Sequence, residues 1–463
     1  MAWFIVIASN LTMGIAWHRF LAFFNIFYKR NIDKPALGAL PEMLSKGKPV
    51  NFEDPAEDDV FGIGTRGDIS WKGLLDMTSC TECGRCQSQC PAWHTDKPLS
   101  PKLLIMAMRD HAMAKVVETE KVVGENAPIS LDVLWSCTSC GACVNECPVD
   151  IEHVDHIVNM RRFQVLVESE FPSELGGTFR NLEKAGNPWG ANKQDREAWI
   201  AECDFPVRVV SGELPEDVEY LFWVGCAGAY EDRAKKTTKA VAELLHMAGV
   251  NFAVLGKRET CTGDPARRSG NEFLYQILSQ ENIETFKETF GNRGVKKVVV
   301  TCPHCFTTIG KDYAQSGYEL QMLHHTQLLN TLVKEGKLKT SPHKADQKIT
   351  FHDPCYLGRH NQIYAPPREL LEASGCDIEE MPRNQERSFC CGGGGGRMWM
   401  EEKIGTRINL NRVDEAIDTG VKEVAVGCPF CRIMIGDGMV ARQSDVEVLD
   451  VAQVLLRNVK SSQ

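Results

Sequence analysis

Short apolar blocks recur along the C-terminal half of the chain, in the same order in two consecutive stretches. The blocks of residues 216–340 are VEYLFWVG, NFAVLG and KKVVVT, and those of residues 341–463 are KITFHDP, DIEEM and KEVAVG. Segments with the helical period separate them, as in DRAKKTTKAVAELLHMAG and PPRELLEASG. Strands that alternate with helices are typical of a parallel sheet, so the pattern predicts two repeated α/β domains.

Residues 71–170 have a helical pattern instead. In SPKLLIMAMRDHAMAKVVE, Ser100 suits an N-cap, Pro101 suits the first turn, and apolar residues recur at intervals of three and four. The segment after Cys147, VDIEHVDHIVNMRRFQVLVES, is similar, and the two segments together predict an α-helical domain. The polar residues of this second segment are assigned to a solvated or docking face, with no ligand role: His153, His156, Arg161 and Arg162. Residues 171–215 are rich in Gly, Asn and charge, which predicts a linker with little regular structure.

The N-terminus raises the question of a membrane. Residues 2–17 carry no charge, and a second apolar run follows His18 and Arg19 as far as Tyr28. Because a span needs about 20 apolar residues, this interrupted stretch predicts a membrane-anchoring or interfacial helix over residues 1–30, with a buried soluble helix as the alternative. The basic residues that follow predict that the rest of the chain lies on the cytoplasmic side of the cell membrane. They are Lys29, Arg30 and Lys34. Residues 31–70 are polar and contain several prolines, which predicts an extended tether.

Charge and cysteine content narrow the chemistry. A formal charge of −10 argues against a nucleic-acid partner. The 19 cysteines of this 463-residue chain gather mostly in Cys-x2-Cys groups, which indicates metal binding in a reducing compartment rather than disulfides. Cys203 and Cys376 stand outside these groups and are interpreted as buried free thiols.

Two cysteine runs in the helical domain have the spacing of bacterial ferredoxins. The runs are Cys80-x2-Cys83-x2-Cys86-x3-Cys90-Pro91 and Cys137-x2-Cys140-x2-Cys143-x3-Cys147-Pro148. In two-cluster ferredoxins the fourth cysteine of each run binds the other cluster. We therefore predict one cubane [4Fe–4S] cluster on Cys80, Cys83, Cys86 and Cys147. The second is predicted on Cys137, Cys140, Cys143 and Cys90. Zinc knuckles fit a run of four cysteines poorly.

Each α/β copy has its own cysteine group at the predicted strand ends, where the sites of parallel sheets gather. The first copy offers Cys226, Cys261, Cys302 and Cys305, and the second offers Cys355, Cys390, Cys391, Cys428 and Cys431. Four thiolates satisfy a cubane, whereas five suggest an unusual iron–sulfur cluster. Gly392–Gly396 allow the backbone to approach that cluster and donate N–H groups to its sulfurs. Other polar residues flank the two groups and are candidates for hydrogen bonds to the clusters or for a docking rim: His304, His352, Arg267, Arg268 and Arg359.

With these motifs the chain resembles a family of iron–sulfur oxidoreductase subunits that join a two-cluster helical ferredoxin to two cysteine-rich CCG domains. The family includes the heterodisulfide reductase catalytic subunit, the iron–sulfur subunits of glycolate oxidase and anaerobic glycerol-3-phosphate dehydrogenase, and membrane proteins that link electron-transfer flavoprotein to quinone. Residues matching its CCG motif are Cys355, Cys390, Cys391, Gly392, Cys428 and Cys431. The resemblance implies that they hold a non-cubane [4Fe–4S] cluster and are the catalytic group. The first copy departs from the motif at Thr262, so we expect an ordinary cubane there as a fourth cluster.

The resemblance implies an enzyme subunit that passes electrons from a flavoprotein donor, either electron-transfer flavoprotein or a flavin dehydrogenase subunit, towards membrane quinone or a quinone-reducing membrane subunit. The apolar N-terminus resembles the end of the membrane domain found in the flavoprotein-to-quinone branch. Two alternatives stay open: the iron–sulfur subunit of a flavin 2-hydroxyacid or glycerol-3-phosphate dehydrogenase, and a disulfide reductase with its chemistry at the CCG cluster. The chain has no flavin or nicotinamide fingerprint, so a dehydrogenase would be a separate protein.

Overall fold

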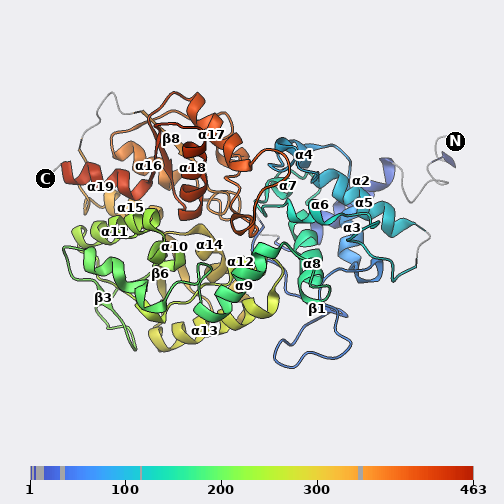
Figure 1. Cartoon of the computed structure of the whole chain (residues 1–463), viewed down its shortest axis with the longest axis horizontal. Helices are drawn as coiled ribbons and strands as arrows, with labels where there is room; N and C mark the ends of the chain where they lie inside the picture. The colour runs from blue at the N-terminus through green and yellow to red at the C-terminus, as the bar shows by residue number, and fades with distance from the viewer. Residues whose placement is uncertain are drawn as a thin grey trace.

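The computed structural model describes residues 15–31, 37–114, 117–341 and 348–461, together with Ala2, Ile5 and Val6. The N-terminal part of the chain, blue to cyan in Figure 1, forms one lobe, and the green-to-red remainder forms a second lobe beside it. The first lobe is helical and the second contains parallel sheets, so the predicted mixed fold class is confirmed. The exact domain boundaries stay predictions.

Short helices precede, interrupt, separate and follow the two cysteine runs of the first lobe. They are α3 (Trp71–Ser79), α4 (Arg85–Ser88), α5 (Pro101–Met113), α6 (Leu131–Trp135), α7 (Ala142–Asn145) and α8 (His153–Leu166). Helices α3, α5 and α6 each begin behind a serine N-cap whose hydroxyl accepts a backbone N–H, including the predicted Ser100; each cap contributes about 1 kcal/mol. Gly84 and Gly141 precede α4 and α7 with φ of 79° and 77°, so the repeated sequence produces a repeated turn.

The N-terminal helix α2 (Ile15–Phe27) packs against α3. Asn25 Nδ2 donates a hydrogen bond to the Val149 carbonyl at 2.8 Å, which fixes the helix beside the second cysteine run. Among the described residues, no helix is long and apolar enough to cross a membrane. The apolar run over residues 2–17 lies mostly outside the described residues, as does Lys34, so a helix over the whole of residues 1–30 is not part of the described fold.

Residues 31–70 were predicted to form an extended tether, but their described part packs against both lobes. It contains a small antiparallel pair, β1 (Leu44–Ser45) and β2 (Lys48–Pro49). Leu40 is buried, and its backbone N–H donates to Asp312 of the second lobe at 3.0 Å. Arg162 of α8 donates to the Pro41 carbonyl at 2.8 Å. Residues 37–50 therefore join the lobes.

The prediction of little regular structure in residues 171–215 is wrong. Helix α9 (Ser173–Ala185) and a 3-10 helix (Lys193–Glu202) occupy much of this segment. Leu175, Phe179 and Leu182 lie one turn apart on α9 and are buried. Gly186 ends the helix in the left-handed region, with φ of 63°.

The second lobe contains a five-stranded and a four-stranded sheet that share the order of four equivalent strands, and β3 is an extra edge strand of the first. The first runs β3-β5-β4-β6-β7 and the second runs β11-β10-β8-β9, with all pairs parallel. The strands of the first are β3 (Arg208–Val209), β4 (Tyr220–Trp223), β5 (Phe252–Val254), β6 (Lys297–Val300) and β7 (Gln321–His324). Those of the second are β8 (Lys348–His352), β9 (Asp377–Ile378), β10 (Glu423–Val426) and β11 (Glu447–Asp450). Strands β4 to β7 thus correspond to β8 to β11, and the predicted repeat is confirmed.

Helices cover both sheets and join them through one apolar core. In the first domain they are α10 (Gly225–Tyr230), α11 (Asp232–Met247), α12 (Asp264–Arg268), α13 (Glu272–Phe290), α14 (Pro303–Thr307) and α15 (His325–Lys334). The second has α16 (Ala365–Ala373), α17 (Ile408–Asp418), α18 (Pro429–Ala441) and α19 (Val451–Ser461). Phe222 and Leu245 of the first domain share a buried cluster with Phe351, Leu371 and Leu455 of the second. Burial of this shared apolar surface holds the two sheets in a fixed relation.

Candidate metal centres

The two cysteine runs of the helical lobe are interleaved. Cys147, from the second run, lines one cavity with three cysteines of the first: Cys80, Cys83 and Cys86. We call this the outer set, because Cys83 is exposed. Burial raises the pKa of Cys147 to about 11 and that of Cys86 to about 12. These thiols therefore hold their protons at neutral pH until a metal replaces them.

Cys90 lies with the second run in the same way. It lines a cavity with Cys137, Cys140 and Cys143, which we call the inner set. All four of these cysteines are buried. The structure thus brings together both groups of four that the exchange of fourth cysteines predicts.

Five cysteines meet at the carboxyl ends of the second sheet. Cys355 follows β8, Cys390 and Cys391 lie on the glycine-rich loop, and Cys428 and Cys431 lie at the start of α18. Each is only 1–6% exposed. Hydrogen bonds from Cys390 and Cys431 hold the pKa of Cys391 well below its ordinary value. Burial raises the pKa of Cys428, but hydrogen bonds from Cys302 and Cys431 outweigh it and bring the value to about 6. The pKa values of Cys355 and Cys431 are instead raised well above the ordinary value, mainly by a neighbouring thiol and by burial respectively, so the thiols of this set share their protons unequally.

The glycine run has two roles in this set. The Gly392 N–H donates to Cys390 Sγ at 3.3 Å, as predicted for backbone that approaches the site closely. The second role was not predicted. A Cβ on Gly394 would lie 2.4 Å from the Thr138 carbonyl oxygen, inside the turn that carries Cys137. The glycines therefore allow this loop to rest directly on the ferredoxin lobe.

The four cysteines of the first sheet also share one cavity: Cys226, Cys261, Cys302 and Cys305. Arg196 donates to Cys226 Sγ at 3.4 Å and pairs with Glu259 at 2.7 Å. The hydrogen bond from Cys261 and the charge of Arg196, acting against burial, lower the pKa of Cys226 to about 7. Thr262 is buried beside Cys261, and its carbonyl accepts a hydrogen bond from Tyr313. Four thiols therefore surround this site, one fewer than in the second domain.

Neighbouring thiols link three of the sets in series. Cys140 of the inner set and Cys390 of the five-cysteine set lie close enough for each to shift the pKa of the other. The same holds for Cys302 of the first domain and Cys428 of the five-cysteine set. The five-cysteine set therefore lies between the inner set and the first-domain set.

Comparison with known proteins agrees with this arrangement. Residues 79–151 match the 4Fe-4S dicluster domain, and residues 220–310 and 349–436 both match the cysteine-rich domain CCG. The chain is 34% identical to the "Probable membrane-anchored ferredoxin" of Chromohalobacter salexigens, over 96% of this chain and 70% of the relative. The chain belongs to the CCG-domain iron–sulfur oxidoreductases. Its helical lobe is a 4Fe-4S dicluster domain, and both of its sheets belong to CCG domains.

Two further members of the family are longer than this chain. The "Probable iron-sulfur-binding oxidoreductase FadF" of Bacillus subtilis is 38% identical over 92% of this chain and 66% of its own length. The "EtfAB:quinone oxidoreductase" of Syntrophomonas wolfei is 41% identical over 86% of this chain and 60% of its own length. The chain therefore spans two thirds or less of the length of these relatives.

Buried arginines fit the charge of such clusters. Arg161 donates to four backbone carbonyls at 2.7–3.0 Å, among them those of Cys137 and Gly395, and the described residues place no carboxylate in an ion pair with it. Burial lowers its pKa to about 10, which leaves it cationic at neutral pH. Because an iron–sulfur cluster with thiolate ligands is an anion, a guanidinium held here offsets its charge. Arg359 is placed similarly and donates to the Cys140 carbonyl at 2.9 Å.

The solvated face expected on α8 is not present. The four residues assigned to it are at most 5% exposed: His153, His156, Arg161 and Arg162. Arg162 pairs with Glu272 of the second lobe at 2.9 Å, so the docking interpretation fits this residue.

The flanking residues of the CCG groups divide into two kinds. Arg267 and Arg268 both pair with Asp312, and His304 pairs with Asp264 at 3.0 Å. These contacts form a buried ion-pair network within the first domain. Arg359 and His352 instead lie against cysteine-bearing backbone or thiols.

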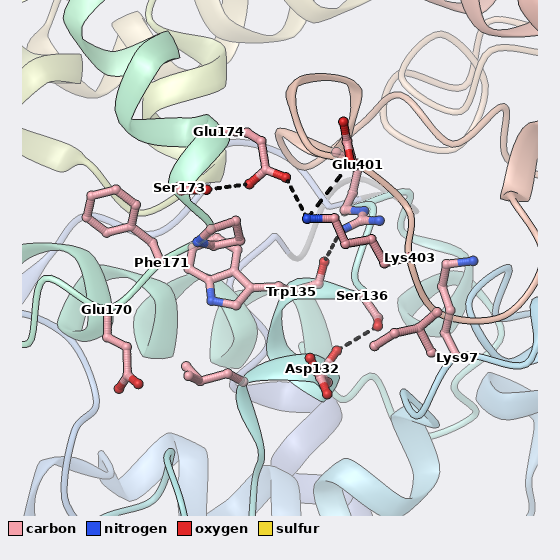
Figure 2. A pocket seen from close by; sticks show the side chains of 14 residues that line it. Lys97, Asp132, Trp135, Ser136, Glu170, Phe171, Ser173, Glu174, Glu401 and Lys403 are labelled. Atoms are coloured by element: carbon pink, nitrogen blue, oxygen red, sulfur yellow. Dashed lines mark hydrogen bonds and ion pairs between the residues drawn. The ribbon is translucent and has the colours of Figure 1, made fainter.

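A surface cavity of about 380 Å³ lies outside the inner set and was not anticipated from the sequence. Its walls come from α6, the start of α9 and the loop after the glycine run. Figure 2 shows Lys403 between Glu174 and Glu401, above Trp135 in this view. Trp135 lies two residues before Cys137, so this surface cavity is close to the inner set.

Proposed function

We propose that the chain relays electrons from a flavoprotein donor towards membrane quinone. The observation that carries this proposal is the series of cysteine sets in mutual contact, from the inner set through the five-cysteine set to the first domain. The name of the Syntrophomonas relative, EtfAB:quinone oxidoreductase, supports the choice of donor and acceptor.

The residues divide into four ligand groups under this proposal. The outer and inner sets each hold a cubane [4Fe–4S] cluster. The five-cysteine set holds a further, non-cubane [4Fe–4S] cluster, and Cys226, Cys261, Cys302 and Cys305 hold a fourth. Bound clusters of this kind accept and release single electrons. The protein contributes thiolates at fixed positions, buried cations such as Arg161, and walls that exclude water.

An exposed aromatic face marks the end of the relay that is nearest the membrane. Phe20, Phe23 and Phe27 of α2 are 61–67% exposed. The same helix bonds to Val149, two residues from Cys147 of the outer set. Exposed aromatic clusters of this kind indicate a membrane or protein contact. The outer set is therefore the point of exchange with a quinone-reducing membrane partner.

The sidedness expected from the basic residues has no structural support. Lys29 pairs with Asp150 at 3.3 Å, and Arg30 pairs with Asp155 at 2.9 Å. These two residues hold α2 to the helical lobe. Attachment to the cytoplasmic face of the membrane stays part of the proposal.

Disulfide reduction at the five-cysteine set is the second candidate, favoured by its extra thiol. Burial argues against it, because no thiol of this set is more than 6% exposed. A disulfide substrate would need the loop over residues 390–396 to open.

The deciding experiment combines metal analysis with electron delivery. Protein purified without oxygen should hold about 12 to 16 iron atoms per chain, matching three or four clusters. Reduced electron-transfer flavoprotein should then bleach the cluster absorbance, and a water-soluble quinone should restore it. Iron at these levels with no bleaching by the flavoprotein refutes the proposed donor, and bleaching that only a disulfide reverses supports the second candidate.

A further inference from the structure

His352 ends strand β8, three residues before Cys355, and is 1% exposed. A ring nitrogen of His352 and the Sγ atoms of Cys391 and Cys431 all lie within 4.8 Å of one another. Nδ1 accepts a hydrogen bond from Arg412 at 3.0 Å. Nε2 is buried and has no hydrogen-bond partner among the residues that the structure describes.

Arg412 determines which nitrogen of His352 carries the proton. A guanidinium donates hydrogen bonds and accepts none, so Nδ1 must be the unprotonated nitrogen. The ring proton is therefore on Nε2, the nitrogen without a partner. Arg412 is itself fixed by Glu415 at 2.7 Å and by the Arg383 carbonyl at 2.8 Å. The ring thus presents an N–H donor, which cannot bind iron unless it loses that proton.

The first domain repeats this feature with a different side chain. Trp223 ends strand β4, three residues before Cys226, so it corresponds to His352. Its indole lines the cavity formed by the four cysteines of that domain. Trp223 is 1% exposed, and its Nε1 also lacks a hydrogen-bond partner within the described part of the chain. Indole N–H is only a donor, so the feature that the two domains share is an N–H group and not a metal ligand.

We infer that His352 and Trp223 are equivalent N–H donors, each aimed at a sulfur of the cluster held by its own domain. This inference rests on the proposed function, which places clusters in both cysteine groups. Leaving a buried N–H without an acceptor costs free energy, and a cluster sulfur would supply the acceptor. Hydrogen bonds to cluster sulfurs withdraw negative charge and favour the reduced state. Both donors are neutral, so they raise the potential without adding a cation to the site.

Redox titration of variants, followed by electron paramagnetic resonance on the full cluster-loaded chain, tests this inference. Signals of the two sites are first assigned with C261S and C391S. We expect H352L to shift the midpoint potential of the second-domain cluster to a more negative value and H352Q, which keeps an N–H donor, to restore part of the shift. W223F should shift the first-domain cluster alone, in the same direction. H325Q and W199F are matched controls at buried residues outside the cysteine cavities, and they should shift neither cluster.

Labelling the unaltered chain with ¹⁵N-histidine gives a measurement that does not depend on the folding of variants. A hydrogen bond to sulfur gives a weak nitrogen coupling to the reduced second-domain cluster, and a directly bound nitrogen gives a strong one. A weak coupling supports the inference, and a strong or absent coupling overturns it, as do unchanged potentials in H352L and W223F. Iron analysis distinguishes failure of the proposed function from failure of the donor role. A second domain without iron refutes the proposed function. A second domain that holds its cluster but shows no histidine coupling refutes only the donor role of His352.

Discussion

The two CCG domains share a strand order and a cysteine spacing, yet their sites are built from different chemistry. The first has four thiols, a cationic donor to Cys226 in Arg196, and Trp223 at the strand end. The second has a fifth thiol in Cys391 and a neutral histidine at the strand end. Its glycine loop rests on the turn of the ferredoxin lobe that carries Cys137, and its Cys390 lies beside Cys140 of the inner set. The two domains therefore share a scaffold but differ in the side chains around their cysteines, and the second domain places its cysteine set beside the inner set.

The largest effect should come from making the second domain like the first. C391T introduces the residue that the first domain has at Thr262, and it removes a thiol whose pKa lies well below its ordinary value. We expect the spectrum of the proposed non-cubane cluster to be lost and the iron content to fall by up to about four atoms per chain. Metal analysis with Mössbauer spectroscopy measures both.

The matched control for C391T is C376S, which alters a buried cysteine outside all four sets. It should retain full iron and an unchanged spectrum. If C391T keeps the same cluster type as the unaltered chain, then the fifth thiol does not account for the difference between the two domains.

The next effect concerns Arg196, the cation that donates a hydrogen bond to the Cys226 thiol of the first domain. R196Q leaves Glu259 buried without its partner, and breaking a buried pair of this kind costs about 3–5 kcal/mol. The midpoint of urea unfolding of the metal-free chain, followed by tryptophan fluorescence, should fall accordingly. The double variant R196M/E259Q removes both charges and should recover part of the loss. Equal losses in the single and double variants would show that packing, and not charge pairing, explains the effect.

The sequence predicted those features of the two domains and of the ferredoxin lobe that depend on the spacing of nearby residues. Strands β4, β6, β8 and β10 end one or two residues before the apolar blocks end, and the exchange of Cys90 and Cys147 matches the two cavities. These features follow from periodicity and from turns that a few residues define.

Features that depend on distant partners could not be predicted in this way. Arg161 bonds to carbonyls 27 and 234 residues away, so no local pattern distinguishes it from a solvated arginine. Helix α9 was missed because Gly176 and Gly177 suggest a loop, whereas burial of Leu175, Phe179 and Leu182 favours the helix. The unpartnered N–H of Trp223 likewise became visible only when its strand was placed beside the cysteine cavity.

A smaller effect should come from disturbing the contact between the glycine loop of the second domain and the turn that carries Cys137. G394A would place a Cβ 2.4 Å from the Thr138 carbonyl, and overpacking of this kind costs about 1–3 kcal/mol. We expect slower reduction of the second-domain cluster in stopped-flow experiments, because the loop must move away from the turn that carries Cys137. G393A is the control, since the nearest atom to its Cβ would be Met434 Cγ at 3.2 Å, on a flexible side chain. Equal rates in the two variants would mean that the loop contact does not set the rate.

The smallest effect should come from the surface charges that accompany the same contact. Lys403 lies 3.5 Å from Glu174 of α9 and 3.8 Å from Glu401, and its side chain is 70% exposed. Exposed pairs contribute about 0–1 kcal/mol because solvent and salt screen them, so K403A should change the free energy of unfolding by less than about 1 kcal/mol. Its electron-transfer rate should equal that of the unaltered chain. A K403A variant as slow as G394A would show that charge pairing across the cavity, and not glycine packing, holds the second domain against the ferredoxin lobe.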